Sequence, residues 1–292
     1  MNETLSIVFS KDRPMQLRAT IDSFLLHCVD VNNIDIIVYF KATSDNIKKQ
    51  YNKLNVLYEG VTFVEELNFE KDVRDILHRY KFLLMQVDDN IWVRECDIGK
   101  AIDVVENNNE VIGFSYRLSP ALKIDYLTGR KINIPKSVEI DGSLKYNWIG
   151  GGHEFGYSLE VTGTLYRATD IFKAIKGKRF VNPNSFERAL SKARKSFNGK
   201  PYLICQKELS VFMAPVNLVQ DCTKNKSGTS NGYSVDALAL KFNDGYKIDI
   251  EKFVDFDTDA CGNEVKFNFI KENSVNYLPH HKDGGFLRQA YE

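Results

Sequence analysis

Strand-like and helix-like segments alternate through the first 116 residues of the chain. Five apolar runs of six or seven residues have the length and composition of buried strands. Between them, apolar residues recur at helical spacing behind residues that start helices well, namely Pro14, Asp45, Asn68 and Asp97. Short connections between such elements predict right-handed crossovers and a mostly parallel sheet with helices on both faces. The expected fold class is therefore α/β, with strands at residues 4–9, 34–40, 61–66, 81–87 and 110–116.

Ligands bind at the carboxyl ends of the strands in sheets of this kind. Three polar segments directly follow predicted strands, at residues 10–13, 41–44 and 88–90. The predicted topology gathers all three along one edge of the sheet. We therefore expect a binding site at that edge.

The second half of the chain has a mixed pattern. A hairpin is expected with its turn at Thr128 and Gly129, and strands are expected at residues 159–166 and 209–219. A turn followed by a helix, with Ser185 as the candidate cap, lies between those two strands. No linker or repeat separates the halves, so we expect them to form one domain.

The composition excludes several classes of function. The chain has 39 basic and 39 acidic residues, so no global field attracts nucleic acid, although a local basic patch is left open. No apolar run reaches the roughly 18 residues of a membrane span, and the N-terminus lacks the features of a signal peptide. Five scattered cysteines without a CxxC motif indicate reduced thiols in a cytoplasmic protein. The motifs of P-loop ATPases and serine hydrolases do not occur.

The triplet Asp88, Asp89 and Asn90 stands at the end of the fourth predicted strand. Two carboxylates and an amide supply the hard oxygen ligands that Mg²⁺ or Mn²⁺ prefers. Such an ion commonly neutralises the charge of a diphosphate leaving group. The alternative is an ordinary turn, in which Asp and Asn are frequent. The position of the triplet at a strand end favours the functional interpretation.

Six segments follow one another over roughly residues 5–190, namely SIVFSKDRPMQLRATIDSF, VYFKATSDNIKKQY, FEKDVRDIL, FLLMQVDDNIW, VTGTLYRATDIF and FVNPNSFERAL. In the order of these segments, the chain resembles the GT-A glycosyltransferases, which use nucleotide sugars and carry a DxD-type motif. The likeness is greatest to bacterial and viral enzymes of glycan assembly.

The resemblance implies a GT-A type α/β fold. Residues 1–116 would be a nucleotide-sugar-binding half, and residues 117–219 a mixed acceptor-binding and catalytic half of the same domain. Residues 220–292 match no part of the family pattern; we expect a C-terminal extension that could cap the active site, form an oligomer contact or touch a membrane. The implied reaction moves a sugar from a nucleoside-diphosphate sugar, by default a UDP-sugar, to a hydroxyl of a glycan or lipid-linked acceptor. Inversion and assistance by Mn²⁺ or Mg²⁺ are expected, in the cytoplasm or at the inner face of a membrane.

The resemblance also implies roles for residues at the ends of the first strands. Each has a structural alternative, such as capping a helix, entering a helix or lying on a solvated helix face. The residues implied to contact the nucleotide are Phe9, Ser10, Arg13, Thr43, Ser44, Asp72 and Asp88.

The implied metal ligands are Asp89, Asn90 and a histidine far downstream, for which His281 is the candidate. The sequence departs from the family pattern here, because the last position of the motif is normally aspartate. The neutral amide of Asn90 is a weaker ligand for a hard cation. The alternative for His281 is a surface residue.

Glu187 is the first candidate for the base that removes a proton from the acceptor hydroxyl. Its alternative is a first-turn glutamate stabilised by the helix dipole. Glu154, in a glycine-rich aromatic segment, and Glu160 are the other candidates.

Two other functions compete with glycosyl transfer. A nucleotidyltransferase that makes nucleotide sugars would share the α/β half, but it usually has a glycine-rich loop after the first strand. The loop SKDRPM contains no glycine, which counts against that function. A non-catalytic sugar- or nucleotide-binding module is supported by Asn90 alone.

Overall fold

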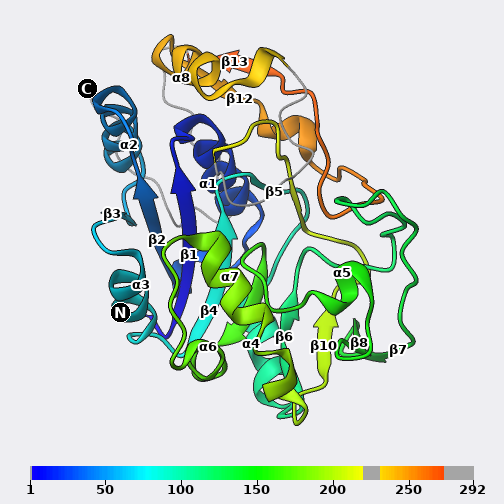
Figure 1. Ribbon diagram of the computed structural model, residues 1–292. Coiled ribbons are helices and arrows are strands. Elements are labelled where there is room, and N and C mark those ends of the chain that lie inside the picture. The colour runs from blue at the N-terminus through cyan, green and yellow to red at the C-terminus, as the bar shows by residue number, and fades with distance from the viewer. Residues whose placement is uncertain (1, 220–230, 273–292) are drawn as a thin grey trace.

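The computed structural model describes residues 2–219 and 231–272, and a nine-stranded sheet forms its centre (Figure 1). The strand order is β3-β2-β1-β4-β9-β6-β10-β8-β7. Two smaller sheets pair β5 with β11 and β12 with β13. The strands are β1 Thr4–Lys11, β2 Ile34–Lys41, β3 Val61–Glu65, β4 Phe82–Val87, β5 Asn90–Trp92, β6 Val111–Ser115, β7 Ser137–Ile140, β8 Ser143–Asn147, β9 Thr164–Arg167, β10 Tyr202–Cys205, β11 Val211–Met213, β12 Tyr246–Ile248 and β13 Phe269–Lys271.

Helices cover both faces of the central sheet. Helix α7 lies in front of the sheet in Figure 1, and α8 with β12 and β13 lies above its upper edge. The α-helices are α1 Pro14–His27, α2 Asp45–Leu57, α3 Phe69–Leu77, α4 Ile98–Glu106, α5 His153–Gly156, α6 Ala168–Ile175, α7 Pro183–Ser191 and α8 Val235–Asn243, and the 3₁₀ helices are η1 Val31–Asn33, η2 Arg194–Phe197, η3 Asn231–Tyr233 and η4 Ile250–Phe253.

The five strands expected in the first half are confirmed, each to within two residues at either end. β1 pairs in parallel with β2 and β4, and β2 pairs in parallel with β3. β9 runs antiparallel to both β4 and β6, so β6 points in the same direction as β4. The α/β fold with a parallel first half is thus as predicted.

Four strands of the second half, β7 to β10, join the same sheet, whereas β11, β12 and β13 lie in the two smaller sheets. β10 is parallel to β6, and β8 and β7 follow as antiparallel strands, so the expected mixed character is confirmed. The strands expected at residues 159–166 and 209–219 are present but shorter, as β9 and β11. The expected hairpin is reduced to one antiparallel bridge between Ile124 and Lys131. The residues between them form a turn, in which Asp125 Oδ1 accepts both the N–H and the hydroxyl of Thr128.

Helix caps correct two details of the sequence analysis. The N-cap of α2 is Ser44, whose hydroxyl accepts the Ile47 N–H, whereas Asp45 lies inside the first turn. The N-cap of α7 is Asn182, and Ser185 completes a reciprocal capping box from within the helix. In both cases the residue in extended backbone conformation, one to three positions earlier, is the one that can accept the free N–H.

The C-terminal elements pack on α1 and α2. Gln50 of α2 donates to the Ala239 carbonyl of α8 at 2.9 Å, and Arg18 of α1 pairs with Glu272 beyond β13. Within residues 2–219 and 231–272, every helix is too short or too polar to cross a bilayer.

Candidate active site

In open α/β sheets a crevice forms at the carboxyl edge where the strand order reverses, and in this sheet the order reverses between β1 and β4. From β1 the chain moves outward through β2 and β3 and then returns to the other side of β1 as β4. Ligands of open α/β sheets bind at such switch points. The segments that end β1 and β4 meet here, so the carboxyl-edge prediction for residues 10–13 and 88–90 places them side by side.

Asp88 lies where these two segments meet and contacts three residues of the segment 10–13. Its Oδ2 accepts the Ser10 hydroxyl at 2.9 Å and the Lys11 N–H at 3.0 Å, and its Oδ1 lies 3.0 Å from Arg13 Nη1. The side chain is 4% exposed. Burial raises the pKa of Asp88 to about 6, and the neighbouring Arg13 guanidinium only partly offsets that rise.

Arg13 ties three segments together through four side-chain contacts. Its Nη1 also lies 3.1 Å from Asp89 Oδ2, its Nε donates to Asn217 Oδ1 at 2.8 Å, and its Nη2 donates to the Asn217 carbonyl. The backbone N–H of Arg13 and the Ser10 hydroxyl both bond the Tyr51 hydroxyl. As placed, Arg13 shapes the crevice from beneath.

The loop after β2 is held by the loop after β1. Asp12 adopts a positive φ of 55°, and its carboxylate accepts the Thr43 N–H at 2.7 Å and the Thr43 hydroxyl at 3.0 Å. Thr43 therefore lies at the crevice, whereas the Ser44 hydroxyl caps α2. Phe9 is buried and packs on Tyr39 and other aromatic rings, so it supports the crevice as part of the core.

Asp72 lies at the start of α3, on the β3 side of the same edge. Its Oδ2 accepts the Asn68 N–H at 2.7 Å, the Leu67 N–H at 3.1 Å and the Tyr39 hydroxyl at 2.9 Å. Partial burial acts to raise the pKa of Asp72, but these hydrogen bonds outweigh it and lower the pKa. Asp72 is accordingly ionised at neutral pH and fixes the Tyr39 hydroxyl at the sheet edge.

The triplet at residues 88–90 forms a tight turn into β5. Asn90 is 1% exposed, its Oδ1 accepts the Val87 N–H at 2.8 Å, and its Nδ2 has no hydrogen-bond partner among the described residues. Asp89 is the one member that is partly exposed, and Arg13 already contacts its Oδ2.

These donors do not fit a metal held by the protein. The oxygens of Asp88 and Asn90 are engaged by protein donors, and the positive charge of Arg13 stands where a cation would be needed. Across the described ranges, no group of three or more His, Cys, Asp or Glu side chains is arranged to hold a metal ion. His281 lies outside the described residues.

A second cluster brings together all three carboxylates expected from the sequence. Arg117, directly after β6, is 3% exposed; its Nη1 lies 2.7 Å from Glu154 Oε2 and its Nε lies 3.5 Å from Glu160 Oε2. Glu160 is buried and accepts the hydroxyls of Thr162 and Thr164. Glu154 and Glu160 are thus both paired with Arg117, and Glu160 also accepts hydrogen bonds from two threonines.

Glu187 completes this cluster from the first turns of α7. It is partly buried, it accepts the Val161 N–H at 3.4 Å, and the Tyr157 hydroxyl bonds its carboxyl group. Burial, and next the negative charge of Glu160, raise the pKa of Glu187 from 4.5 to about 7. A carboxyl group that titrates near neutrality can both take up and release a proton.

The two clusters share one edge of the sheet. β9 runs antiparallel to β4 with Thr164 opposite Met85, so the 158–163 loop opens at the same edge as Asp88. Phe186, beside Glu187, packs against Phe9 of β1 with ring centroids 6.1 Å apart. The geometry therefore provides a crevice and a neighbouring proton acceptor.

Sequence reasoning missed three residues of these clusters. Arg117 follows a predicted strand, so the rule that selected residues 10–13 would also have selected it. Tyr51 has the position of an apolar residue in a helix stripe, and no sequence signal marks Asn217.

Comparison with known proteins yields structural likeness alone. No protein-family model matches the sequence, and no curated protein does. A structure of S. aureus TarS 1-349 in complex with UDP-GlcNAc is 11% identical, with a TM-score of 0.47, over 78% of this chain and 61% of that chain. A mannosyltransferase, PcManGT from Pyrobaculum calidifontis in complex with GDP-Man and Mn²⁺, is 12% identical, with a TM-score of 0.34, over 63% of this chain and 55% of that chain.

A third structure, 4-diphosphocytidyl-2C-methyl-D-erythritol synthase from Anaerococcus prevotii, is 10% identical, with a TM-score of 0.36, over 64% of this chain and 82% of that chain. The chain spans only 37% of the longer TarS structure and about three fifths of the truncated one. At these identities and TM-scores the likeness assigns no function, which has to come from the site itself.

Proposed function

We propose that the chain is a glycosyltransferase that moves a sugar from a nucleoside-diphosphate sugar to a hydroxyl of a glycan or lipid-linked acceptor. The observation that carries this proposal is the position of Glu187. Its carboxyl group, with a pKa near 7, lies at the carboxyl edge of the sheet beside the switch-point crevice.

The donor would bind across the carboxyl ends of β1, β2 and β4. The nucleoside would lie toward Thr43 and the Tyr39–Asp72 pair, where the loops after β2 and β3 end. Ser10 and Asp88 would line the floor next to the ribose and diphosphate. A UDP-sugar is the first donor to test, because it is the default in the family that the sequence resembles.

In the transfer step, the acceptor oxygen attacks the anomeric carbon while the bond from that carbon to the diphosphate oxygen breaks. The nucleoside diphosphate leaves with the bonding electron pair, and the acceptor proton passes to a carboxylate oxygen of Glu187. Attack opposite the leaving group would invert the anomeric configuration. Tyr157 would orient the Glu187 carboxyl group through its hydroxyl.

The leaving diphosphate needs positive charge, which Mn²⁺ or Mg²⁺ supplies in related chemistry. The described ligand atoms at residues 88–90 do not fit an ion held by the protein alone. Lys11, partly exposed at the end of β1, is the cation of the described site best placed to turn toward the diphosphate. In the structure its Nζ donates to the Val219 carbonyl at 2.9 Å.

A thermal-shift series with UDP, GDP, CMP and dTDP, each with and without Mn²⁺, tests the donor site. A ligand at about 100 times its dissociation constant stabilises by roughly 2.7 kcal/mol, which is readily detected. A shift with one nucleotide identifies the base, and its change with Mn²⁺ reports metal use. Absence of any shift would contradict the proposal.

A turnover assay then separates transfer from binding. The matching nucleotide sugar is incubated with the chain, and release of nucleoside diphosphate is measured. A non-catalytic binding module is the second candidate, because Asp88 and Asn90 are already engaged by the protein. Such a module would show the thermal shift but release no nucleoside diphosphate.

A further inference from the structure

The zero net charge of the chain conceals a strong local imbalance. Residues 168–200, which form α6, α7 and η2, contain nine of the 39 basic residues and only two of the 39 acidic residues. The rest of the chain therefore carries seven more acidic than basic residues. Such an asymmetry creates a local field that the total charge does not reveal.

The two acidic residues of this segment do not neutralise its surface. Asp170 is 6% exposed and lies 2.6 Å from Lys200 Nζ, and Glu187 turns toward Val161 and Tyr157. The exposed charges are consequently all positive. We call this surface the α6–α7 face; its exposed members are Lys173, Lys176, Arg179, Arg188, Lys192 and Lys195.

The positive charges of the α6–α7 face are largely uncompensated. Burial and the positive charge of Lys192 lower the pKa of the nearby Lys178, which follows α6 and donates to the Ala189 carbonyl of α7. Among the described residues, no carboxylate lies within 4.0 Å of the charged groups of Arg188, Lys192 or Lys195.

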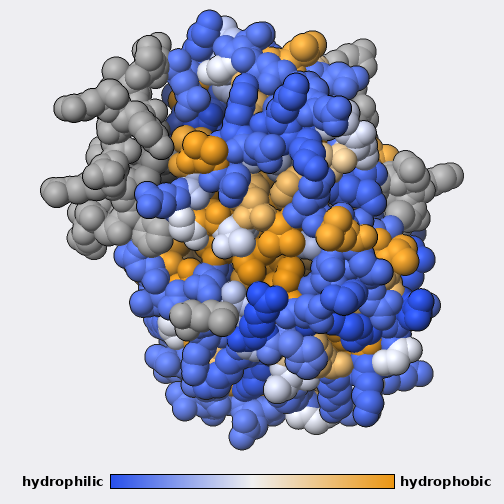
Figure 2. Space-filling view, turned by 90° about the vertical axis from the view of Figure 1, so that its left-hand side faces the viewer, coloured by the Kyte–Doolittle hydropathy of each residue, from blue (hydrophilic) through white to orange (hydrophobic). Residues whose placement is uncertain are grey.

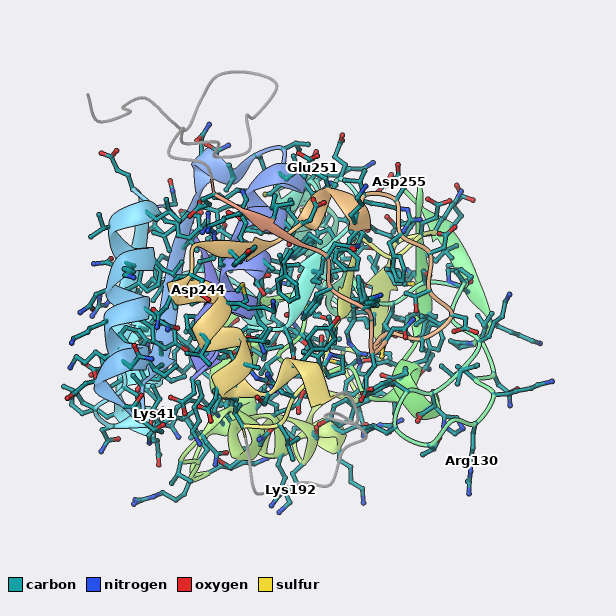
Figure 3. All side chains as sticks on the ribbon, turned by 90° about the horizontal axis from the view of Figure 1, so that it is seen from above. Lys41, Arg130, Lys192, Asp244, Glu251 and Asp255 are labelled. Atoms are coloured by element: carbon teal, nitrogen blue, oxygen red, sulfur yellow. The ribbon has the colours of Figure 1, made fainter. Side chains whose placement is uncertain are left out.

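The opposite side of the molecule is acidic. Residues 244–259 contain six acidic and two basic residues. Seen from above in Figure 3, Lys192 projects from one side of the molecule, and Glu251 and Asp255 lie at the opposite side. A molecule polarised in this way orients itself in front of a negatively charged surface.

Exposed apolar side chains border the α6–α7 face. Val181, in the loop between α6 and α7, is 73% exposed, and Leu67, just before α3, is 90% exposed. The two loops are joined where Arg179 lies 3.3 Å from Glu70. Figure 2, which shows the side that carries α2 and α3, has apolar side chains gathered among hydrophilic ones. Cations beside exposed apolar side chains match the chemistry of a lipid interface.

We propose that the α6–α7 face docks the protein on membranes that contain anionic lipids. The basic side chains would contact the phosphate headgroups, Val181 would enter the headgroup region, and the acidic side would face the solvent. A soluble polyanion would account for the cations but not for the exposed apolar residues. The docking surface stands apart from the transfer reaction. If both hold, α7 brings Glu187 close to a lipid-linked acceptor.

Co-sedimentation of the full chain with vesicles tests the surface. Wild-type protein should pellet with vesicles of phosphatidylcholine and phosphatidylglycerol and stay in the supernatant with phosphatidylcholine alone. The triple variant Arg188→Gln, Lys192→Gln, Lys195→Gln should bind the anionic vesicles at least ~10-fold more weakly, given the contribution of each basic residue near an anionic surface. Val181→Ser should weaken binding by a smaller factor.

A matched control removes three lysines in or beside the acidic segment 244–259. Lys123→Gln, Lys247→Gln, Lys252→Gln changes the net charge equally and should leave vesicle binding within about twofold of wild type. Lys247 and Lys252 belong to that segment and the Lys123 N–H bonds the Asp259 carbonyl, so these side chains would lie away from the membrane. Equal losses in the two triple variants would show that binding follows net charge and not this face. Wild-type protein that ignores anionic vesicles but binds inorganic polyphosphate would also overturn the proposal. The nucleotide thermal shift, measured on every variant, checks the fold and keeps the outcome separate from the proposed transfer reaction.

Discussion

Arg13 Nη1 lies 3.0 Å from Asp88 Oδ1, and both side chains are nearly excluded from solvent. This ion pair joins the ends of β1 and β4 at the point where the sheet reverses its strand order. Because the two residues are 75 positions apart, the pair fixes the relative position of two loops that the proposed donor would touch. Loss of one partner therefore has consequences beyond a single contact.

Arg13→Gln should destabilise the protein by roughly 3–5 kcal/mol, because it leaves Asp88 buried without its counter-charge. Urea denaturation of the single and double variants measures this loss. Arg13→Gln combined with Asp88→Asn should recover part of it, since no buried charge is then unpaired. A single variant within ~1 kcal/mol of wild type would mean that Asp88 takes up a proton at little cost or that water reaches the pair.

The pKa of Glu187, raised to about 7, predicts the pH dependence of transfer. The base must be ionised to accept a proton, so kcat/KM should rise with pH through about 7 and then level off. Glu187→Gln should lower turnover by on the order of 10²- to 10⁴-fold and leave nucleotide affinity nearly intact. Glu59→Gln, an exposed glutamate on the other face of the molecule, is the control that should behave as wild type. Wild-type turnover in Glu187→Gln would end the assignment of this base.

The same pKa shift predicts an effect on stability. The folded state holds the Glu187 proton up to a pH of about 7, whereas the unfolded chain releases it near the ordinary value of 4.5. The folded state thus binds more protons in this interval, and stability falls as pH rises from 4.5 to 7. Glu187→Gln removes the effect, so the variant should gain roughly 3 kcal/mol over wild type on going from pH 4.5 to pH 8. Urea denaturation at both pH values measures the difference, and an equal gain at both would contradict the shifted pKa.

A substitution at Asn90 distinguishes between a metal site and an ordinary turn at residues 88–90. If Asn90 were a weakened metal ligand, Asn90→Asp would strengthen Mn²⁺-dependent nucleotide binding. In the structure its Oδ1 accepts the Val87 N–H inside the protein, so the new carboxylate would be buried without a counter-charge. We expect a loss of roughly 2–4 kcal/mol in stability and no new Mn²⁺ dependence in the thermal shift. A gain of Mn²⁺-dependent stabilisation would restore the metal interpretation.

The local pattern of the sequence predicts the first half well. Strands β1, β2, β4 and β6 are buried on both faces, and helices α2, α3 and α4 carry side-chain caps and periodic apolar stripes, so each of these segments is encoded by its own residues. β7 was not predicted because three of its four residues are exposed and it lacks an apolar run. β5 has three residues and exists through its pairing with β11, more than 100 positions away.

The candidate site, too, was predictable only in part. The carboxyl-edge rule brought residues 10–13 and 88–90 together, because it depends on topology alone. The rule could not predict that Arg13 and Asn90 form hydrogen bonds within the protein, because those bonds depend on how the side chains pack. The pKa of Glu187 likewise depends on Glu160 and Arg117, which the fold brings in from distant positions.

Glu160 offers a test of the electrostatics of the second cluster. After burial, its negative charge is the main cause of the raised pKa of Glu187. Glu160→Gln keeps the shape while removing that charge. Its amide oxygen can replace Oε2 as the acceptor for Thr162, and its NH₂ group can donate to the Thr164 hydroxyl. The midpoint of the pH–rate profile should therefore move below about 7, with kcat on the plateau nearly unchanged.

Glu154→Gln is the matched control for this experiment. It also removes a carboxylate from Arg117, at 2.7 Å, but Glu154 is not among the groups that shift the pKa of Glu187. Its profile should keep the wild-type midpoint. A midpoint that moves equally in both variants would show that the neutralised Arg117 ion pairs, and not the proximity of Glu160, set the proton affinity of the proposed base.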